Sequence, residues 1–155
     1  MPEELRETTS PTPDADAKRA EQLTEKYGFS NWYDWQVSNW GTKWDVSSDG
    51  ETVETAGDAT EVTVYFNTAW SPPIGWYQHM EDEQSFGISA FYYEMGMSFC
   101  GIYEDGSDDY YEISGDSAWV EKHIPAGINE AFNISENMAM WEDEQATEED
   151  SNDAE

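Results

Sequence analysis

One stretch constrains the fold of this chain more than any other, because a strand pattern in it runs directly into a helix start. Residues 62–76 read Val-Thr-Val-Tyr-Phe-Asn-Thr-Ala-Trp-Ser-Pro-Pro-Ile-Gly-Trp, and Val62, Val64, Phe66 and Trp70 would share one face of an extended strand. The Ser-Pro pair at residues 71–72 suits an N-cap and a first helical position. We therefore expect a strand up to Trp70, a helix from residue 72, and the hydrophobic core around this corner.

The residues expected to build that core are six aromatic side chains and two prolines. They are Trp40, Trp44, Phe66, Trp70, Pro72, Pro73, Trp76 and Phe99. If Trp70 is buried as expected, Trp70→Ala should cost about 3–5 kcal/mol of folding free energy.

The remaining pattern predicts an α+β chain. Helices are expected at residues 13–27 and 31–40, each ended by a glycine, and helical periodicity returns from residue 116. Strands at 85–95, 97–104 and 109–114 have short connections, which favours an antiparallel meander with an Asp-Gly turn at 105–106. A short strand is expected at 43–46 and a weak edge at 52–55. The helix after residue 72 could cross over between parallel strands at 61–70 and 85–95. The sum is a sandwich of one mostly antiparallel sheet of four to five strands with helices on one face.

Three segments are expected along the chain. Residues 1–11 are polar and without periodicity, which is typical of a loose N-terminal arm. Residues 12–135 hold the α+β domain. Residues 136–155 read as an acidic, disordered tail, because they have too few apolar side chains to offset the entropy of ordering.

Charge is the compositional outlier of the sequence. Thirty-five Asp and Glu against six Lys and Arg give a formal net charge of −29, which disfavours direct binding to nucleic acid or to an anionic membrane. Three interpretations stay open: a halophilic surface adapted to high salt, acidic segments that keep a small protein soluble, and mimicry of nucleic acid. Mimicry needs carboxylates in rows on a rigid surface. The candidates lie in or beside predicted elements: Asp45, Glu81, Glu83, Glu94, Glu104, Asp109 and Glu112.

No sequence segment points to a membrane or to a disulfide. Apolar runs are all shorter than the roughly 18 residues that a spanning helix needs, and a signal-peptide pattern is missing, so we expect a cytoplasmic protein. Cys100 is the single cysteine. It lies in an aromatic run, and we expect it to be a small buried apolar residue rather than a nucleophile.

The sequence offers no cofactor, metal or catalytic set. His79, His123 and Cys100 are too scattered for a convincing zinc site. Residues 104–109 are rich in oxygen ligands but lack the spacing of a calcium loop, so a solvated hairpin tip is expected. Glu94 is the one acid in a strongly aromatic run and the only candidate for acid–base chemistry.

Several motifs resemble the YubB-like family of phage and plasmid proteins. They are Asn-Trp-Tyr-Asp-Trp at 31–35, Asn-Trp-Gly-Thr-Lys-Trp-Asp at 39–45, Phe-Asn-Thr-Ala-Trp-Ser-Pro-Pro-Ile at 66–74 and Gly-Met-Ser-Phe-Cys-Gly at 96–101. The resemblance covers about residues 1–135 and implies a ferredoxin-like domain without established catalytic residues. Residues 1–5 resemble an internal segment of longer members, which begin with a further strand and helix. Such a missing strand would leave an unpaired sheet edge for a protein partner or a second copy.

These observations favour a non-catalytic accessory protein of phage or plasmid type that binds another protein, in the host cytoplasm if a virus encodes it. One alternative is an acidic nucleic-acid mimic that inhibits a DNA-binding or defence enzyme of the host. A second is a small enzyme of unknown reaction, which would need Glu94 and His79 to meet in a pocket with a polar neighbour.

Overall fold

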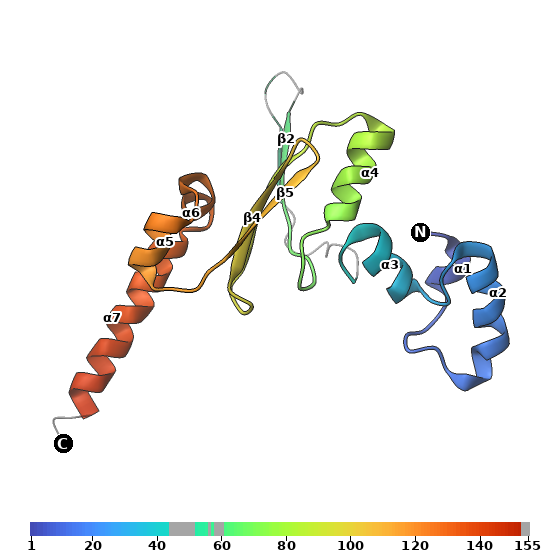
Figure 1. The fold of residues 1–155 in the computed structure, drawn as a ribbon, viewed down its shortest axis with the longest axis horizontal. Coiled ribbons are helices and arrows are strands. Elements are labelled where there is room, and N and C mark those ends of the chain that lie inside the picture. Colours follow the sequence, from blue (N-terminus) through green and yellow to red (C-terminus); the bar gives the residue numbers. More distant parts are fainter. Residues whose placement is uncertain (44–51, 56, 58–60, 153–155) are drawn as a thin grey trace. The chain divides into compact units, whose positions relative to one another are not determined.

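The computed structural model describes residues 1–43, 52–55, 57 and 61–152, and the chain divides into two compact units, Met1–Phe86 and Gly87–Glu155. Both units are shown in Figure 1. The α+β class is confirmed. The described strands form a two-stranded and a three-stranded antiparallel sheet, so the expected single sheet of four to five strands is not what the structure shows. Instead of one domain over 12–135, each unit has its own buried residues.

The first unit begins with two helices that are packed together. They are α1 (Glu3–Arg6) and α2 (Ala17–Tyr27), with the short 3-10 helix η1 (Asp14–Asp16) leading into α2. Leu5 is fully buried on α1 and Leu23 is buried on α2. Residues 1–11 are therefore a packed part of the unit, where the sequence predicted a loose arm. Gly28 ends α2 in the left-handed conformation, as predicted.

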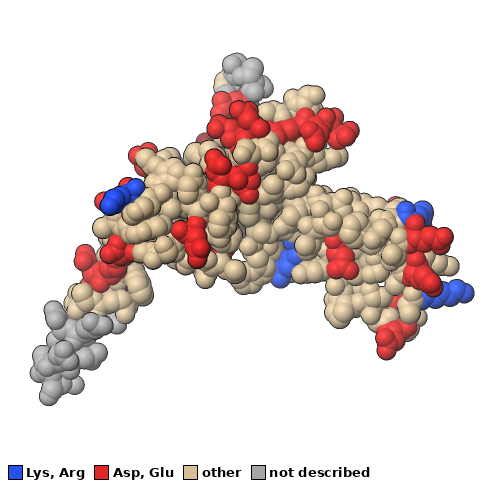
Figure 2. Space-filling model, in the orientation of Figure 1, with Lys and Arg blue, Asp and Glu red and all other residues tan. Residues whose placement is uncertain are grey.

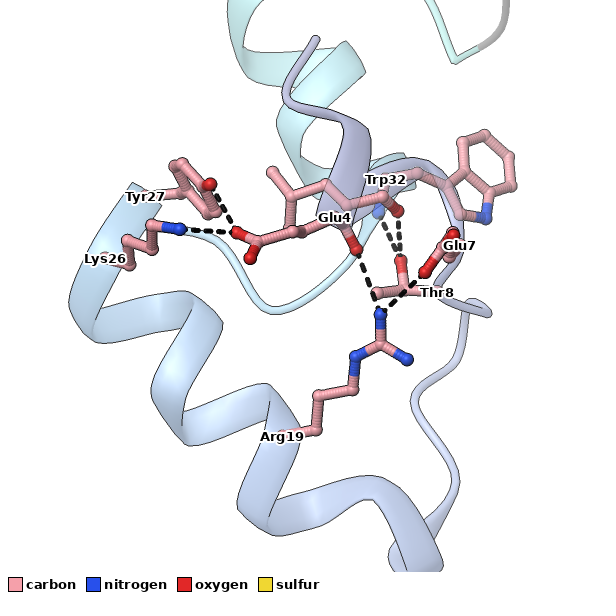
Figure 3. Close-up of polar contacts among 8 residues, drawn as sticks. Glu4, Glu7, Thr8, Arg19, Lys26, Tyr27 and Trp32 are labelled. Atoms are coloured by element: carbon pink, nitrogen blue, oxygen red, sulfur yellow. Dashed lines mark hydrogen bonds and ion pairs between the residues drawn. The ribbon is translucent and has the colours of Figure 1, made fainter.

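Polar contacts fasten α1 to α2 (Figure 3). Lys26 Nζ donates to Glu4 Oε2 at 2.6 Å, and the Tyr27 hydroxyl donates to the same oxygen. These two hydrogen bonds, that from Lys26 first, hold the pKa of Glu4 below its usual value. On the other side of α1, Arg19 donates to Glu7 Oε2 at 3.2 Å. The contacts are solvent-exposed, so they orient α1 more than they stabilise it.

A helix pair and a strand pair complete the described part of the first unit. Helix α3 (Trp32–Trp40) lies against α4 (Ile74–Gln84), and the approach is close: a Cβ on Gly75 would lie 2.5 Å from the carbonyl oxygen of Asn39. Asn31 caps α3 by accepting from the Asp34 N–H, and Gly41 ends it in the left-handed conformation.

Strands β1 (Thr52–Thr55) and β2 (Val62–Tyr65) pair antiparallel, so the edge expected at 52–55 is confirmed. The described strands β2 and β3 belong to different sheets, so the predicted parallel crossover between them is not shown. Most of the strand predicted at 43–46 lies outside the described residues.

The second unit contains the predicted meander. Strands β3 (Ser89–Glu94), β4 (Phe99–Glu104) and β5 (Ser107–Glu112) pair antiparallel in sequence order. The predicted turn between β4 and β5 is confirmed, because Asp105 and Gly106 both have positive φ, 50° and 76°.

Three helices lie on one side of this sheet (Figure 1): α5 (Ser117–His123), α6 (Ala126–Phe132) and α7 (Ile134–Asn152). Of these, α6 lies directly against β3 and β4, and α5 and α7 pack on each other and on α6. Cys100 from β4 is fully buried among apolar side chains of all three helices. They are Val120, Ile124, Ile128 and Ile134. Cys100 is thus the small buried apolar residue that the sequence predicted, and burial raises the pKa of its thiol. This cluster is the core of the second unit.

On the opposite face of the sheet, one aromatic side chain packs closely over a glycine of the neighbouring strand. Tyr92 on β3 lies across Gly101 on β4, and its hydroxyl donates to Asp108 Oδ1 on β5 at 2.7 Å. Burial and this hydrogen bond raise the pKa of Tyr92. A side chain at position 101 would occupy the space of the tyrosine ring.

Helix α7 covers most of the stretch that the sequence predicted as a disordered tail from residue 136. Ile134 and Met138 pack against the core, and Glu142 follows on the same face four residues later. Both Glu142 carboxylate oxygens accept hydrogen bonds from Ser117, one from its backbone N–H at 2.9 Å and one from its hydroxyl at 2.7 Å. A carboxylate at the N-terminus of α5 satisfies an N–H that has no partner within the helix.

Removing this contact should loosen α7. We expect Glu142→Ala to lower the free energy of unfolding of the second unit by about 1–2 kcal/mol, as loss of an N-terminal cap does. Asp143→Ala, at an exposed neighbouring position, should stay within about 0.5 kcal/mol. Urea unfolding followed by circular dichroism compares the two variants, and equal midpoints would contradict the capping role.

Among the described residues, none of the helices is both long enough and apolar enough to cross a membrane.

Candidate functional site

The best-defined surface feature of the first unit is the loop of residues 66–73, which follows β2. Two side-chain hydrogen bonds fasten it to the end of α3. Thr42 Oγ1 donates to the carbonyl oxygen of Ala69 at 3.1 Å, and Ser71 Oγ donates to the carbonyl oxygen of Gly41 at 2.5 Å. The loop is therefore held in one place although it has no regular secondary structure.

Trp70 lies at the centre of this segment, which we call the Trp70 loop. Its φ is +69°, a left-handed conformation that costs a non-glycine residue about 1–2 kcal/mol, and its side chain is 62% exposed. Thr68 Oγ1 donates to the Ser71 carbonyl oxygen at 2.9 Å and closes the turn around it. The ammonium of Lys43 lies 5.7 Å from the centroid of the indole ring.

This arrangement presents a large aromatic side chain to solvent at the cost of backbone strain. Strained residues are retained where the surrounding structure fixes them, and they are frequent at functional sites. Tryptophan buries a large area with few rotatable bonds, and it is enriched among the residues that dominate protein–protein binding energy. The Trp70 loop therefore has the physical properties of a protein-binding anchor.

The exposure of Trp70 corrects the predicted position of the core. Alternation places Trp70 on the face of Val62 and Val64 only if the strand continues through residue 70, but β2 ends at Tyr65. Val62 and Val64 are themselves 53% and 45% exposed. The prediction of a buried corner was wrong because a strand pattern does not show where the strand ends.

The helix that was predicted to begin at residue 72 begins two residues later in the structure. Helix α4 begins at Ile74, with Pro73 at the N-cap position and no capping side chain. The hydroxyl of Ser71, expected to cap the helix, instead holds the loop to Gly41.

The other members of the predicted core motif have different environments. Trp44 lies outside the described residues, and Trp76 is 37% exposed. Trp40 is partly buried and packs edge to face on Trp35, with ring centroids 5.5 Å apart. Phe66 and Pro72 are partly buried. Pro73 is buried in the first unit, and Phe99 is buried in the second.

Within the second unit, the carboxylates proposed for mimicry lie on two faces of the sheet. Asp45 lies outside the described residues, and Glu81 and Glu83 lie on α4 of the first unit. In the second unit, the strand register sets Glu94 and Glu112 in one row on either side of Phe99, whereas Glu104 and Asp109 point to the opposite face of the sheet. Figure 2 shows acidic side chains, in red, on the drawn face of each unit.

The residues considered for catalysis or metal binding lie on different elements of the two units. His79 is exposed on α4, while Glu94 belongs to the second unit and accepts a hydrogen bond from the Met97 N–H in the turn after β3. His123 stacks on Trp119 at 4.5 Å between ring centroids. Within the described ranges, no group of three or more His, Cys, Asp or Glu could hold a metal ion.

A pocket of about 270 Å³ lies between α1 and α2. Its lining residues are Glu4, Arg19, Gln22, Leu23 and Lys26. The two cations already pair with Glu4 and Glu7 (Figure 3), so they serve the helix contact described above.

Comparison with protein-family models, with curated proteins and with solved structures finds no match for this chain.

Proposed function

We propose that this chain is a non-catalytic accessory protein that acts by binding another protein, and that the Trp70 loop is its contact. The observation that carries the proposal is an exposed tryptophan held in a left-handed conformation by a fastened loop. A chain under selection for stability alone would place glycine at such a position.

The wider assignment, to ferredoxin-like proteins of the YubB-like family and to a phage or plasmid origin, belongs to the same proposal. Its support is the likeness of the motifs at residues 39–45 and 66–74, which meet in the structure where Gly41 and Thr42 hold the Trp70 loop. The motif thus coincides with the surface that we propose as the contact.

A pair of substitutions separates the binding role of Trp70 from a structural one. Both Trp70→Ala and Trp70→Gly remove the indole, but only glycine relieves the strain. We expect Trp70→Gly to be more stable than Trp70→Ala by about 0.5–1 kcal/mol, the left-handed penalty less the unfolded-state entropy of glycine. Thermal unfolding of both variants measures this difference. A result in which both lose 3 kcal/mol or more would mean that Trp70 is part of the core.

Binding should not distinguish Trp70→Ala from Trp70→Gly, because both variants lack the indole. Four proteins are used to capture partners from host lysate: the wild type, the two Trp70 variants and Phe86→Ala. A partner that binds through Trp70 is retained by the wild type and by Phe86→Ala only. Phe86 is a matched control, because its side chain is 58% exposed in the same unit. We expect each Trp70 variant to bind such a partner about 30-fold more weakly or worse, as is typical when an anchor residue of an interface is removed. A partner held equally by all four proteins would overturn the proposal, and displacement by duplex DNA would favour mimicry instead.

Two copies of the chain could also pair through a sheet edge, which sedimentation of the wild type tests. Strand β5 is an edge of the three-stranded sheet and carries Asp108, Asp109 and Glu112. Like charges on two such edges oppose pairing. We therefore expect a monomer by sedimentation, and a salt-independent dimer would contradict that expectation.

A further inference from the structure

Helix α7 presents a second exposed apolar surface, in the other unit from the Trp70 loop. Its inner face is occupied, because Ile134 and Met138 pack in the core and Glu142 bonds to Ser117. Further along α7, Trp141 follows Met138 by three residues on the same side of the helix, and it is 62% exposed; Met140, about 100° around the helix from Trp141, is 59% exposed. The two side chains are adjacent in sequence and belong to no packed cluster among the described residues.

Acidic residues surround this pair. Helix α7 contains seven Asp or Glu and no Lys or Arg in its 19 residues, and Glu136, Asp143 and Glu144 are exposed within one or two turns of Trp141. The whole second unit has eighteen acidic residues and one lysine, Lys122. Figure 1 shows α7 extending past α5, so its C-terminal part has no neighbouring helix of its unit beside it.

Charge decides what can cover these side chains. A second copy of this chain, a nucleic acid and an anionic membrane would each bring negative charge to an already negative helix. A cationic protein segment brings the complementary charge. Arg or Lys groups can stack on an exposed indole while pairing with carboxylates beside it, and methionine adapts to the aliphatic parts of such side chains.

We infer that the exposed part of α7 around Met140 and Trp141 docks a basic, amphipathic segment of another protein. Trp141 supplies the apolar and cation–π contact, and Glu136, Asp143 and Glu144 supply the charge. This surface is independent of the Trp70 loop, so either contact can fail without affecting the other.

The test uses the full chain and two synthetic 18-residue peptides. One has leucines at helical spacing with arginines between them, and the other replaces every arginine with glutamate. The chain is labelled with 5-fluorotryptophan, and its Trp141 signal is assigned by loss in Trp141→Phe. We expect the basic peptide to shift that ¹⁹F signal at physiological salt and the acidic peptide to leave it unchanged.

Paired variants then separate docking from general attraction between opposite charges. Met140→Ala/Trp141→Ala should bind the basic peptide about tenfold more weakly or worse, with an unchanged circular dichroism spectrum. Met95→Ala/Met97→Ala is the matched control, because those side chains are 75% and 62% exposed in the same unit. It should bind as the wild type does. Equal binding by all three proteins, binding of the acidic peptide, or self-association lost in the Met140/Trp141 variant would overturn the inference.

Discussion

Gly101→Ala is expected to lower the free energy of unfolding of the second unit by about 3 kcal/mol. A Cβ at this position would lie 2.2 Å from the Tyr92 hydroxyl oxygen and 2.6 Å from the backbone carbonyl oxygen of Asp109. The tyrosine could move, but only by giving up its hydrogen bond to Asp108, and the carbonyl oxygen belongs to the neighbouring strand of the ladder. Overpacking of this kind typically costs 1–3 kcal/mol and sometimes more.

Gly87→Ala is the matched control, because a Cβ at residue 87 has no heavy atom within 4 Å and the backbone there has no positive φ. It should change stability by less than about 0.5 kcal/mol. Denaturant unfolding compares the two variants, and hydrogen exchange of the β4 amides assigns the loss to the sheet. Tyr92→Ser is itself destabilising, so the cost of Gly101→Ala is measured again in that background. It should be smaller there than in the wild type but not zero, since the contact with Asp109 remains. No cost in that background would show that the tyrosine alone is the obstacle.

Local signals in the sequence predicted the ends of several elements well. Glycines at 28 and 41 end helices because they adopt the left-handed conformation without cost, and the Asp-Gly pair at 105–106 makes the expected turn. Asp116, where helical periodicity was predicted to return, caps α5 by accepting from the Trp119 N–H at 2.8 Å. Each of these features depends only on residues within a few positions of one another.

The candidate site could not be predicted in the same way. The aromatic residues of the segment 62–76 predicted a buried corner, and nothing local shows that the backbone turns Trp70 outward. That orientation depends on hydrogen bonds from Thr42 and Ser71 across about thirty residues of sequence. The one available signal was the Ser-Pro-Pro run, whose two prolines cannot donate to a strand ladder.

Helix α7 was predicted as a disordered tail because its acidic composition does not reveal a tertiary contact. The sequence pattern that matters there is Ile134, Met138 and Glu142 at intervals of four, and its third member is a carboxylate that binds a helix N-terminus. A count of charged residues treats that carboxylate as solvated. Only the position of Ser117, supplied by the tertiary structure, makes it a structural residue.

Leu5→Ala is expected to lower the free energy of unfolding of the first unit by about 2–4 kcal/mol, the range for removing a fully buried leucine side chain. Leu5 is 0% exposed although it lies in a four-residue helix near the chain start. The sequence gives no sign of this, because a single leucine among polar residues has no periodicity. Its burial depends on tertiary contacts: α1 lies against α3, and Glu4 bonds to Arg19 and Lys26 of α2.

Two measurements decide between a packed helix and a loose arm. Thermal unfolding should show a midpoint at least several degrees lower for Leu5→Ala, whereas Val64→Ala, at a side chain 45% exposed in the same unit, should change it little. Trypsin should cleave after Arg6 slowly in the wild type and quickly in Leu5→Ala, because cleavage requires local unfolding of α1. If trypsin cuts both proteins at one rate and their midpoints agree within a degree, α1 is not packed. The contact of Lys26 with Glu4 would then be too weak to hold the segment, since exposed ion pairs contribute little to stability.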